Sequence, residues 1–334
     1  MKLEVKDIKK TFGDKEILKG INFEVESGKA LGLLGRNGAG KTTTIRILMD
    51  VFHANSGEIL LDGEKFNPRK ITIGYLPEER GLYPKRKVID QMIYLARLRG
   101  VSKKKARENS IKWLKRLEVD EYANRALETL SKGNQQKVQL ASTLVSEPNI
   151  VILDEPFSGL DPVNSQILKD VVNELIEEGR IVIFSSHQMS YVEEFCRDIV
   201  IINHGEVVLS GNLLDIQKEY GRDQLVISLV DTDLASSNAF LEKNLSDIIE
   251  ITGFTKTDVI VKLKEGKNRM ELFAALFENA NKEGYEIEHF ETYKPSLNDI
   301  FVERVGEDEQ EQEEKANEAN ADNSKANEGG KENE

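Results

Sequence analysis

A glycine-rich segment near the start of the chain has the residue types and spacing of a phosphate site. The segment reads Gly35-Arg36-Asn37-Gly38-Ala39-Gly40-Lys41-Thr42 and is followed by Thr43. It lies between a strand that we expect at residues 30–34 and a helix that we expect from Lys41 to about Asp50. Glycines let the backbone curl so that its N–H groups face phosphate oxygens, which the helix N-terminus also attracts. We expect Lys41 to reach the β- and γ-phosphates, and the Thr42 hydroxyl to bind Mg²⁺.

Two carboxylates supply the complementary chemistry. Asp154 and Glu155 directly follow residues 150–153, a run of four apolar side chains that predicts a buried strand. Ligands bind beyond the carboxyl ends of the strands in open parallel sheets. We expect Asp154 to reach the metal, and Glu155 to orient and deprotonate a water that attacks the γ-phosphate. The alternative, an acidic pair at a helix N-terminus, is less attractive beside a glycine-rich phosphate segment.

The elements around these residues predict an α/β domain over residues 1–220. Short apolar strands at 30–34, 150–153 and 181–184 are separated by helical patterns, which is typical of a parallel sheet covered on both faces. Strands are also expected at 3–8, 17–25, 58–61, 199–202 and 206–209. A helical insertion is expected from about Lys85 to Glu147.

After Gly221 the pattern changes to a small α+β domain, residues 221–305. Its expected order, β-α-β-β-α-β, is that of a ferredoxin-like unit. It carries no catalytic constellation, so we expect a structural or regulatory role. Residues 306–334 contain eleven acids and three lysines, with alanine the only aliphatic type. Such a segment is expected to be disordered, as a solubilising extension or an acidic interaction tail.

Composition narrows the partners and the compartment. The chain has 334 residues, and its net charge of −13 argues against a nucleic-acid partner. Its single cysteine argues against a disulfide framework. It shows neither an apolar run of the ~18–20 residues that a spanning helix needs nor a signal-peptide pattern. Between Lys85 and Arg116, twelve basic residues stand against two acids. This surface is either simply solvated or lies near anionic lipid or an acidic partner.

Further motifs make residues 1–220 resemble the nucleotide-binding subunits of ABC transporters. Residues 130–136 resemble the LSGGQ signature: Ser131 and Gly133 are kept, while Lys132 and Asn134 depart from it. Three other features occupy the family's positions: a D-loop ending at Asp161, a switch-histidine segment ending at His187, and Phe12 where an aromatic residue stacks on adenine. Glu78 stands where the family usually has glutamine, which puts in doubt how that loop couples to a membrane partner.

The resemblance implies a P-loop ATPase with a mixed sheet and a helical subdomain, using ATP and Mg²⁺. Glu155 would be the base and His187 would polarise the γ-phosphate, with Lys41 completing the catalytic set. Residues 35–43 would bind the nucleotide. The metal ion would be bound by Thr42, Asp154 and Glu78. The remaining nucleotide contacts would come from Phe12, Glu78, Ser131, Gly133 and Asp161.

The resemblance also implies partners. Two ATPase subunits, identical or paralogous, would sandwich two ATPs head to tail beside a separately encoded membrane permease, at the cytoplasmic face of the membrane. Residues 76–83 and 295–301, with the appended domain, resemble the ATPase subunits of sodium-efflux and drug-resistance exporters. Two alternatives remain: a soluble regulatory ATPase of the same fold, and a module that senses nucleotide and seldom hydrolyses it.

Overall fold

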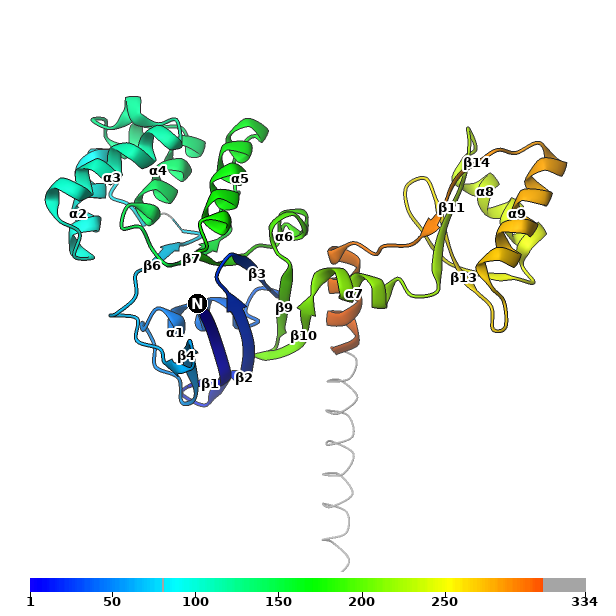
Figure 1. Ribbon diagram of the computed structural model, residues 1–334, viewed down its shortest axis with the longest axis horizontal. Coiled ribbons are helices and arrows are strands. Elements are labelled where there is room, and N and C mark those ends of the chain that lie inside the picture. The colour runs from blue at the N-terminus through cyan, green and yellow to red at the C-terminus, as the bar shows by residue number, and fades with distance from the viewer. Residues whose placement is uncertain (80, 309–334) are drawn as a thin grey trace, which may run out of the picture. The chain divides into compact units, whose positions relative to one another are not determined.

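The computed structural model describes residues 1–79 and 81–308, which form two compact units (Figure 1). The first unit comprises Met1–Leu213 together with the described residues from Phe301 onward, and the second comprises Leu214–Ile300. The chain therefore returns to the first unit after the second, an arrangement that the sequence pattern did not indicate.

The first unit contains two sheets. An antiparallel sheet has the order β2-β1-β4-β5 and consists of β2 (Lys15–Glu26), β1 (Lys2–Phe12), β4 (Ser56–Leu61) and β5 (Glu64–Lys65). A six-stranded sheet is parallel except for its edge strand β10. In order, it consists of β10 (Glu206–Asn212), β9 (Asp198–Asn203), β3 (Lys29–Leu34), β8 (Ile181–Ser185), β7 (Ile150–Asp154) and β6 (Ile73–Leu76).

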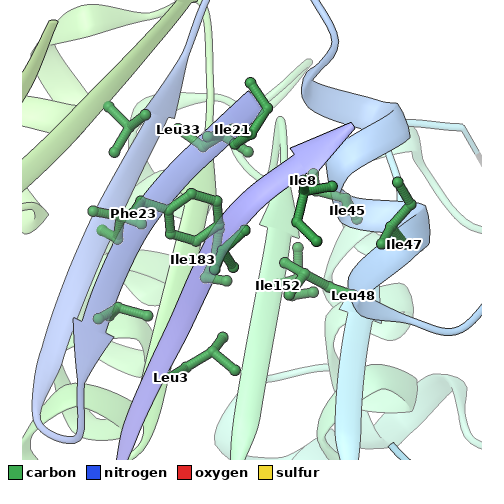
Figure 2. Close-up of a cluster of buried hydrophobic side chains, with 14 of the residues drawn as sticks. Leu3, Ile8, Ile21, Phe23, Leu33, Ile45, Ile47, Leu48, Ile152 and Ile183 are labelled. Atoms are coloured by element: carbon green, nitrogen blue, oxygen red, sulfur yellow. The ribbon is translucent and has the colours of Figure 1, made fainter. Parts of the chain in front are cut away.

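One hydrophobic core joins both sheets to helix α1 (Lys41–Leu48). Figure 2 shows side chains of β1 and β2 facing those of β3, β7, β8 and α1. Every residue of β7 and β8 is buried, as expected for strands covered on both faces. Because α1 is anchored in this core through Ile45 and Leu48, its N-terminus is held firmly at the end of β3.

The expected helical insertion is present. It contains α2 (Val88–Leu98), α3 (Lys103–Arg116) and α4 (Lys132–Leu144), joined by short 3₁₀ turns at Asp120–Tyr122 and Leu127–Thr129. The six-stranded sheet is also flanked by α5 (Pro162–Glu177) and α6 (Met189–Phe195). Three short elements, β5, β6 and α6, were not predicted from the sequence, because two, four and seven residues are too few to show a period.

The second unit has the expected β-α-β-β-α-β order, preceded by α7 (Leu213–Tyr220). The elements are β11 (Gln224–Leu229), α8 (Leu234–Leu245), β12 (Ile249–Phe254), β13 (Val259–Leu263), α9 (Arg269–Glu283) and β14 (Ile287–Thr292). The sheet is antiparallel throughout, in the order β12-β13-β11-β14. Apolar residues of α8 and α9 pack into one core with those strands.

The C-terminal end of the described chain corrects one expectation. Residues 297–308 are helical, so Gly306–Asp308 do not belong to a disordered segment. In the first unit, Arg304 Nε donates to Val208 O at 2.9 Å, and Asn203 Nδ2 donates to Asp308 Oδ2 at 2.7 Å. These bonds to β9 and β10 explain why the helix continues. The expected tail from residue 309 lies outside the described residues.

Within the part of the chain that the structure describes, no helix combines the length and apolarity needed to cross a membrane.

The single cysteine provides a test of the packing. Cys196 is 4% exposed, and burial raises the pKa of its thiol. Because the thiolate is the reactive form, we expect a disulfide reagent at pH 8 to label the native protein very slowly and the denatured protein fully. Rapid labelling of the native protein, followed by thiol absorbance, would contradict this packing.

Candidate nucleotide site

The glycine-rich segment forms the turn between β3 and α1. Gly38 has a φ of +84°, in the left-handed region that favours glycine. At Gly35 a Cβ atom would lie 2.3 Å from Ile202 O, so only glycine fits beside β9 there. The segment thus has the backbone freedom that a phosphate-binding turn needs.

Lys41, the first residue of α1, reaches back over this turn. Its Nζ donates to Gly35 O at 2.6 Å and to Arg36 O at 3.2 Å. Burial lowers the pKa of the Lys41 ammonium, and the negative charges of Asp154, Glu155 and Glu78 oppose that shift. The lysine and three carboxylates singled out in the sequence therefore share one electrostatic neighbourhood.

Asp154, the last residue of β7, is 7% exposed. Burial raises the pKa of its carboxyl, and the Tyr75 hydroxyl, 3.3 Å from Oδ2, opposes the shift by donating a hydrogen bond. Thr42, also expected at the metal, is exposed on the first turn of α1. Hydroxyl and carboxylate oxygens suit Mg²⁺, which takes few protein ligands and completes its shell with phosphates and water. Among the described residues, no group of three or more His, Cys, Asp or Glu side chains is placed to hold a metal ion.

Glu155 makes a dense set of contacts with the segment after β8. Its backbone is left-handed, with a φ of +50°, and its N–H donates to Ser185 O at 2.8 Å. Oε1 lies 2.7 Å from His187 N and 2.8 Å from His187 Nδ1, while Oε2 accepts from Ser186 Oγ at 2.9 Å. The expected base and the expected switch histidine are thus in direct contact. His187 is 71% exposed on its side chain, so it can turn without unpacking the core.

Phe12 ends β1 with its ring accessible. The ring is 43% exposed and meets Phe52 edge-on, with the centroids 5.2 Å apart. Phe52 follows α1, and its backbone N–H donates to Arg46 O. Phe12 is therefore braced on the segment that leaves the phosphate-site helix, and Lys10 Nζ lies over its ring, 4.9 Å from the centroid.

The signature residues lie elsewhere, at the N-terminus of α4. The Ser131 hydroxyl accepts from Asn134 N at 3.3 Å and caps the helix. A Cβ atom on Gly133 would lie 3.3 Å from Asn164 Nδ2. Asn164 in turn donates through its backbone N–H to Asp161, which caps α5. The signature and the D-loop thus meet at one place, and hydrogen bonds from Asn164 lower the pKa of Asp161.

Three α4 side chains that sequence reasoning missed tie the signature helix to strand β6 and to two loops near the site. Gln136 Nε2 donates to Pro156 O at 2.9 Å, and Thr143 Oγ1 donates to Tyr75 O at 3.2 Å. Gln139 Nε2 donates to the carbonyls on both sides of Glu78, Pro77 O at 3.1 Å and Glu79 O at 3.2 Å. Polar residues spaced three and seven apart on one helix face were the signal that could have found them.

Comparison with known proteins agrees with this geometry. A family model described as "ABC transporter" matches residues 18–158, and one described as "ATP-binding protein DrrA1-3-like, C-terminal domain" matches residues 211–305. The chain is 42% identical over 307 residues to the ABC transporter ATP-binding protein YhaQ of Bacillus subtilis, covering 91% of this chain and 98% of YhaQ. This chain belongs to the ABC transporter ATP-binding proteins. It is an ABC ATPase with a DrrA-like C-terminal domain.

Other relatives of this ABC ATPase extend the comparison. The linearmycin resistance ATP-binding protein LnrL of Bacillus subtilis is 28% identical, with 91% of this chain and 98% of LnrL covered. A solved ATP-binding subunit of an ABC transporter has a TM-score of 0.61 at 29% identity, over 66% of this chain and 94% of that one. The dimeric cassette MJ0796 shares the fold, with a TM-score of 0.57 at 24% identity over 63% of this chain and 98% of its own.

The Tyr75–Asp154 contact predicts a pH-dependent metal requirement. Tyr75→Phe removes a donor that holds down the pKa of Asp154, so that pKa rises further and more of the carboxyl is protonated as the pH falls. We expect the Mg²⁺ concentration for half-maximal ATPase activity to rise by about threefold to tenfold at pH 6, and less at pH 8. Tyr94→Phe, at an exposed tyrosine of α2, is the control. An equal effect at both pH values would contradict this reading.

The position of Lys41 predicts its part in binding. Lys41→Ala removes the ammonium from the phosphate turn, and we expect ATP affinity, titrated with a fluorescent analogue, to fall by about tenfold or more. Lys103→Ala, at an exposed lysine of α3, should bind as the parent does. Unchanged ATP affinity in Lys41→Ala would contradict the prediction that this turn binds the phosphates.

Proposed function

We propose that this ABC ATPase powers export through a separately encoded membrane subunit. The observation that carries the nucleotide chemistry is the grouping of Lys41 with Asp154 and Glu155, the latter in contact with His187. Export is supported by the DrrA-like C-terminal model and by the likeness to LnrL, whose name assigns it to linearmycin resistance. Sodium ions and drugs are the proposed cargo classes.

The chain's own groups would bind and orient the nucleotide. Backbone N–H groups of residues 35–43 would surround the phosphates, Lys41 would leave its carbonyl partners for the terminal phosphates, and the Phe12 ring would stack on adenine. Thr42 and Asp154 would hold Mg²⁺, and Glu78 would contact it or its waters. The bound ion would supply charge neutralisation for the phosphates.

Hydrolysis would follow from the placement of Glu155. A water oxygen bonds to the γ-phosphorus while the bond from that phosphorus to the bridging oxygen breaks, and its electron pair stays on ADP. The water proton passes to the Glu155 carboxylate. His187, turned toward the nucleotide, would donate a hydrogen bond to the γ-phosphate as its charge redistributes.

A second ATPase subunit would complete each site. The chain has one phosphate segment and one signature, and Gly133 of the signature lies close to Asn164, whose backbone N–H donates to Asp161 of the D-loop. We propose that these residues and Asp161 meet the nucleotide held by the Lys41 of a partner copy or paralogue, as a dimeric arrangement like that of MJ0796 permits. Such a dimer would act at the cytoplasmic face of the membrane, where the permease subunit lies.

The proposed base predicts a separation of binding from turnover. Glu155→Gln keeps the shape and the hydrogen-bond acceptor but cannot take the proton, so we expect normal ATP affinity and hydrolysis slower by at least about 100-fold. Glu121→Gln, on an exposed turn, should hydrolyse ATP at the parental rate. Phosphate release under saturating ATP measures both. Near-parental turnover in Glu155→Gln would remove Glu155 as the base.

A further inference from the structure

The two oxygens of the Glu155 carboxylate have different kinds of partners. Oε1 accepts from the backbone N–H of His187 at 2.7 Å and lies 2.8 Å from Nδ1 of the His187 ring, which is 71% exposed and free to move. The contact of Oε2 comes from Ser186, which is 4% exposed. When the His187 ring turns away, Oε1 therefore loses the ring contact and keeps only the backbone N–H, whereas the partner of Oε2 is enclosed by the fold.

The hydroxyl of Ser186 has a defined direction. Its oxygen accepts from Gln188 N at 3.1 Å, and a backbone N–H can only donate. An ionised carboxylate can only accept, so the hydroxyl hydrogen must lie on the line to Glu155 Oε2, 2.9 Å away. The Ser186 hydroxyl therefore accepts from the Gln188 N–H and donates to Glu155 Oε2, because neither partner can take the opposite role.

Gln188 precedes α6, so this hydroxyl connects the start of that helix to the carboxylate. The helix is held in turn by Val192 and Phe195, both buried, and Phe195 stacks on Phe157, two residues after Glu155. The contact between Ser186 and Oε2 is consequently anchored on both sides by packing. A side chain held in this way keeps its geometry when a mobile neighbour leaves.

We propose that Ser186 is a positioning residue for ATP hydrolysis. Its buried hydroxyl holds Oε2 of Glu155, so that Oε1 is the oxygen that receives the water proton once the His187 ring turns to the nucleotide. This inference rests on the proposed role of Glu155 as base. It adds which carboxylate oxygen reacts and which side chain fixes that choice.

The test compares variants at position 186 in the full chain. Ser186→Thr keeps the hydroxyl and Ser186→Val has the same shape without it, so any crowding in the buried site is common to both. We expect kcat to be about tenfold lower in Ser186→Val than in Ser186→Thr, with KM for ATP equal within about twofold, because the hydroxyl acts on the base and not on binding.

Ser186→Ala should behave as Ser186→Val does. Ser142→Ala is the matched control, because Ser142 is also 4% exposed and its hydroxyl bonds only within its own helix, to Val138 O at 2.9 Å. We expect Ser142→Ala to keep the parental kcat. Equal kcat values for the Thr and Val variants would overturn the proposal, and so would a fall in kcat of the same size in Ser142→Ala.

A double substitution separates this inference from the proposed function. Since Ser186 acts through Glu155, adding Ser186→Ala to Glu155→Gln should change the residual rate by less than about twofold. A further tenfold loss would show that Ser186 acts by another route and would overturn the inference. Near-parental turnover in Glu155→Gln alone would instead overturn the proposed function, and the inference with it.

Discussion

The ammonium of Lys41 is the group on which the rest of the site depends. It is partly buried and donates hydrogen bonds to two carbonyls of its own turn. The negative charges of Asp154, Glu155 and Glu78 stabilise its positive charge. Burying an ammonium is costly unless its charge is compensated. Three carboxylates converging on one lysine provide that compensation before any phosphate arrives. When a polyphosphate binds at the same place, the ammonium must exchange its carbonyl partners for phosphate oxygens. A cation must then offset the repulsion between the phosphates and the carboxylates.

The core makes that arrangement possible. The phosphate turn follows β3, whereas Asp154 and Glu155 lie at the end of β7, a strand far away in the sequence that is separated from β3 in the sheet by β8. The buried helix α1 fixes one end of the turn, while the approach of Gly35 to β9 fixes the other. The signature helix is tied to the same region by side chains rather than by a shared sheet, through Gln136, Gln139 and Thr143. Movement of α4 would therefore pull on the carbonyls that flank Glu78, which offers a direct route between the helical subdomain and the site.

Most of the fold, and the grouping of Lys41 with Asp154 and Glu155, could be predicted from the sequence, because apolar runs of four or more residues and fixed glycine spacing are local signals. The β-α-β-β-α-β order of the second unit was readable for the same reason. The roles of Tyr75, Ser186 and Gln139 were not, since each depends on a bond to a residue tens of positions away. The return of the chain to the first unit depends on Arg304 and Asp308 bonding to β10 and β9, and no local pattern records such a contact. The departures at Glu78, Lys132 and Asn134 were visible, but their consequences require the partner subunits.

The most direct test of the proposed export through a membrane subunit is to recover the protein from the membranes of its own organism. The chain, tagged after Glu334, would be extracted in mild detergent and every stoichiometric partner identified by mass spectrometry, with the Lys41→Ala variant as a control that should assemble without binding nucleotide well. We expect a second ATPase subunit and a protein with several membrane spans to be recovered with the chain. Recovery of the chain without any membrane protein would contradict it and favour a soluble regulatory ATPase of the same fold.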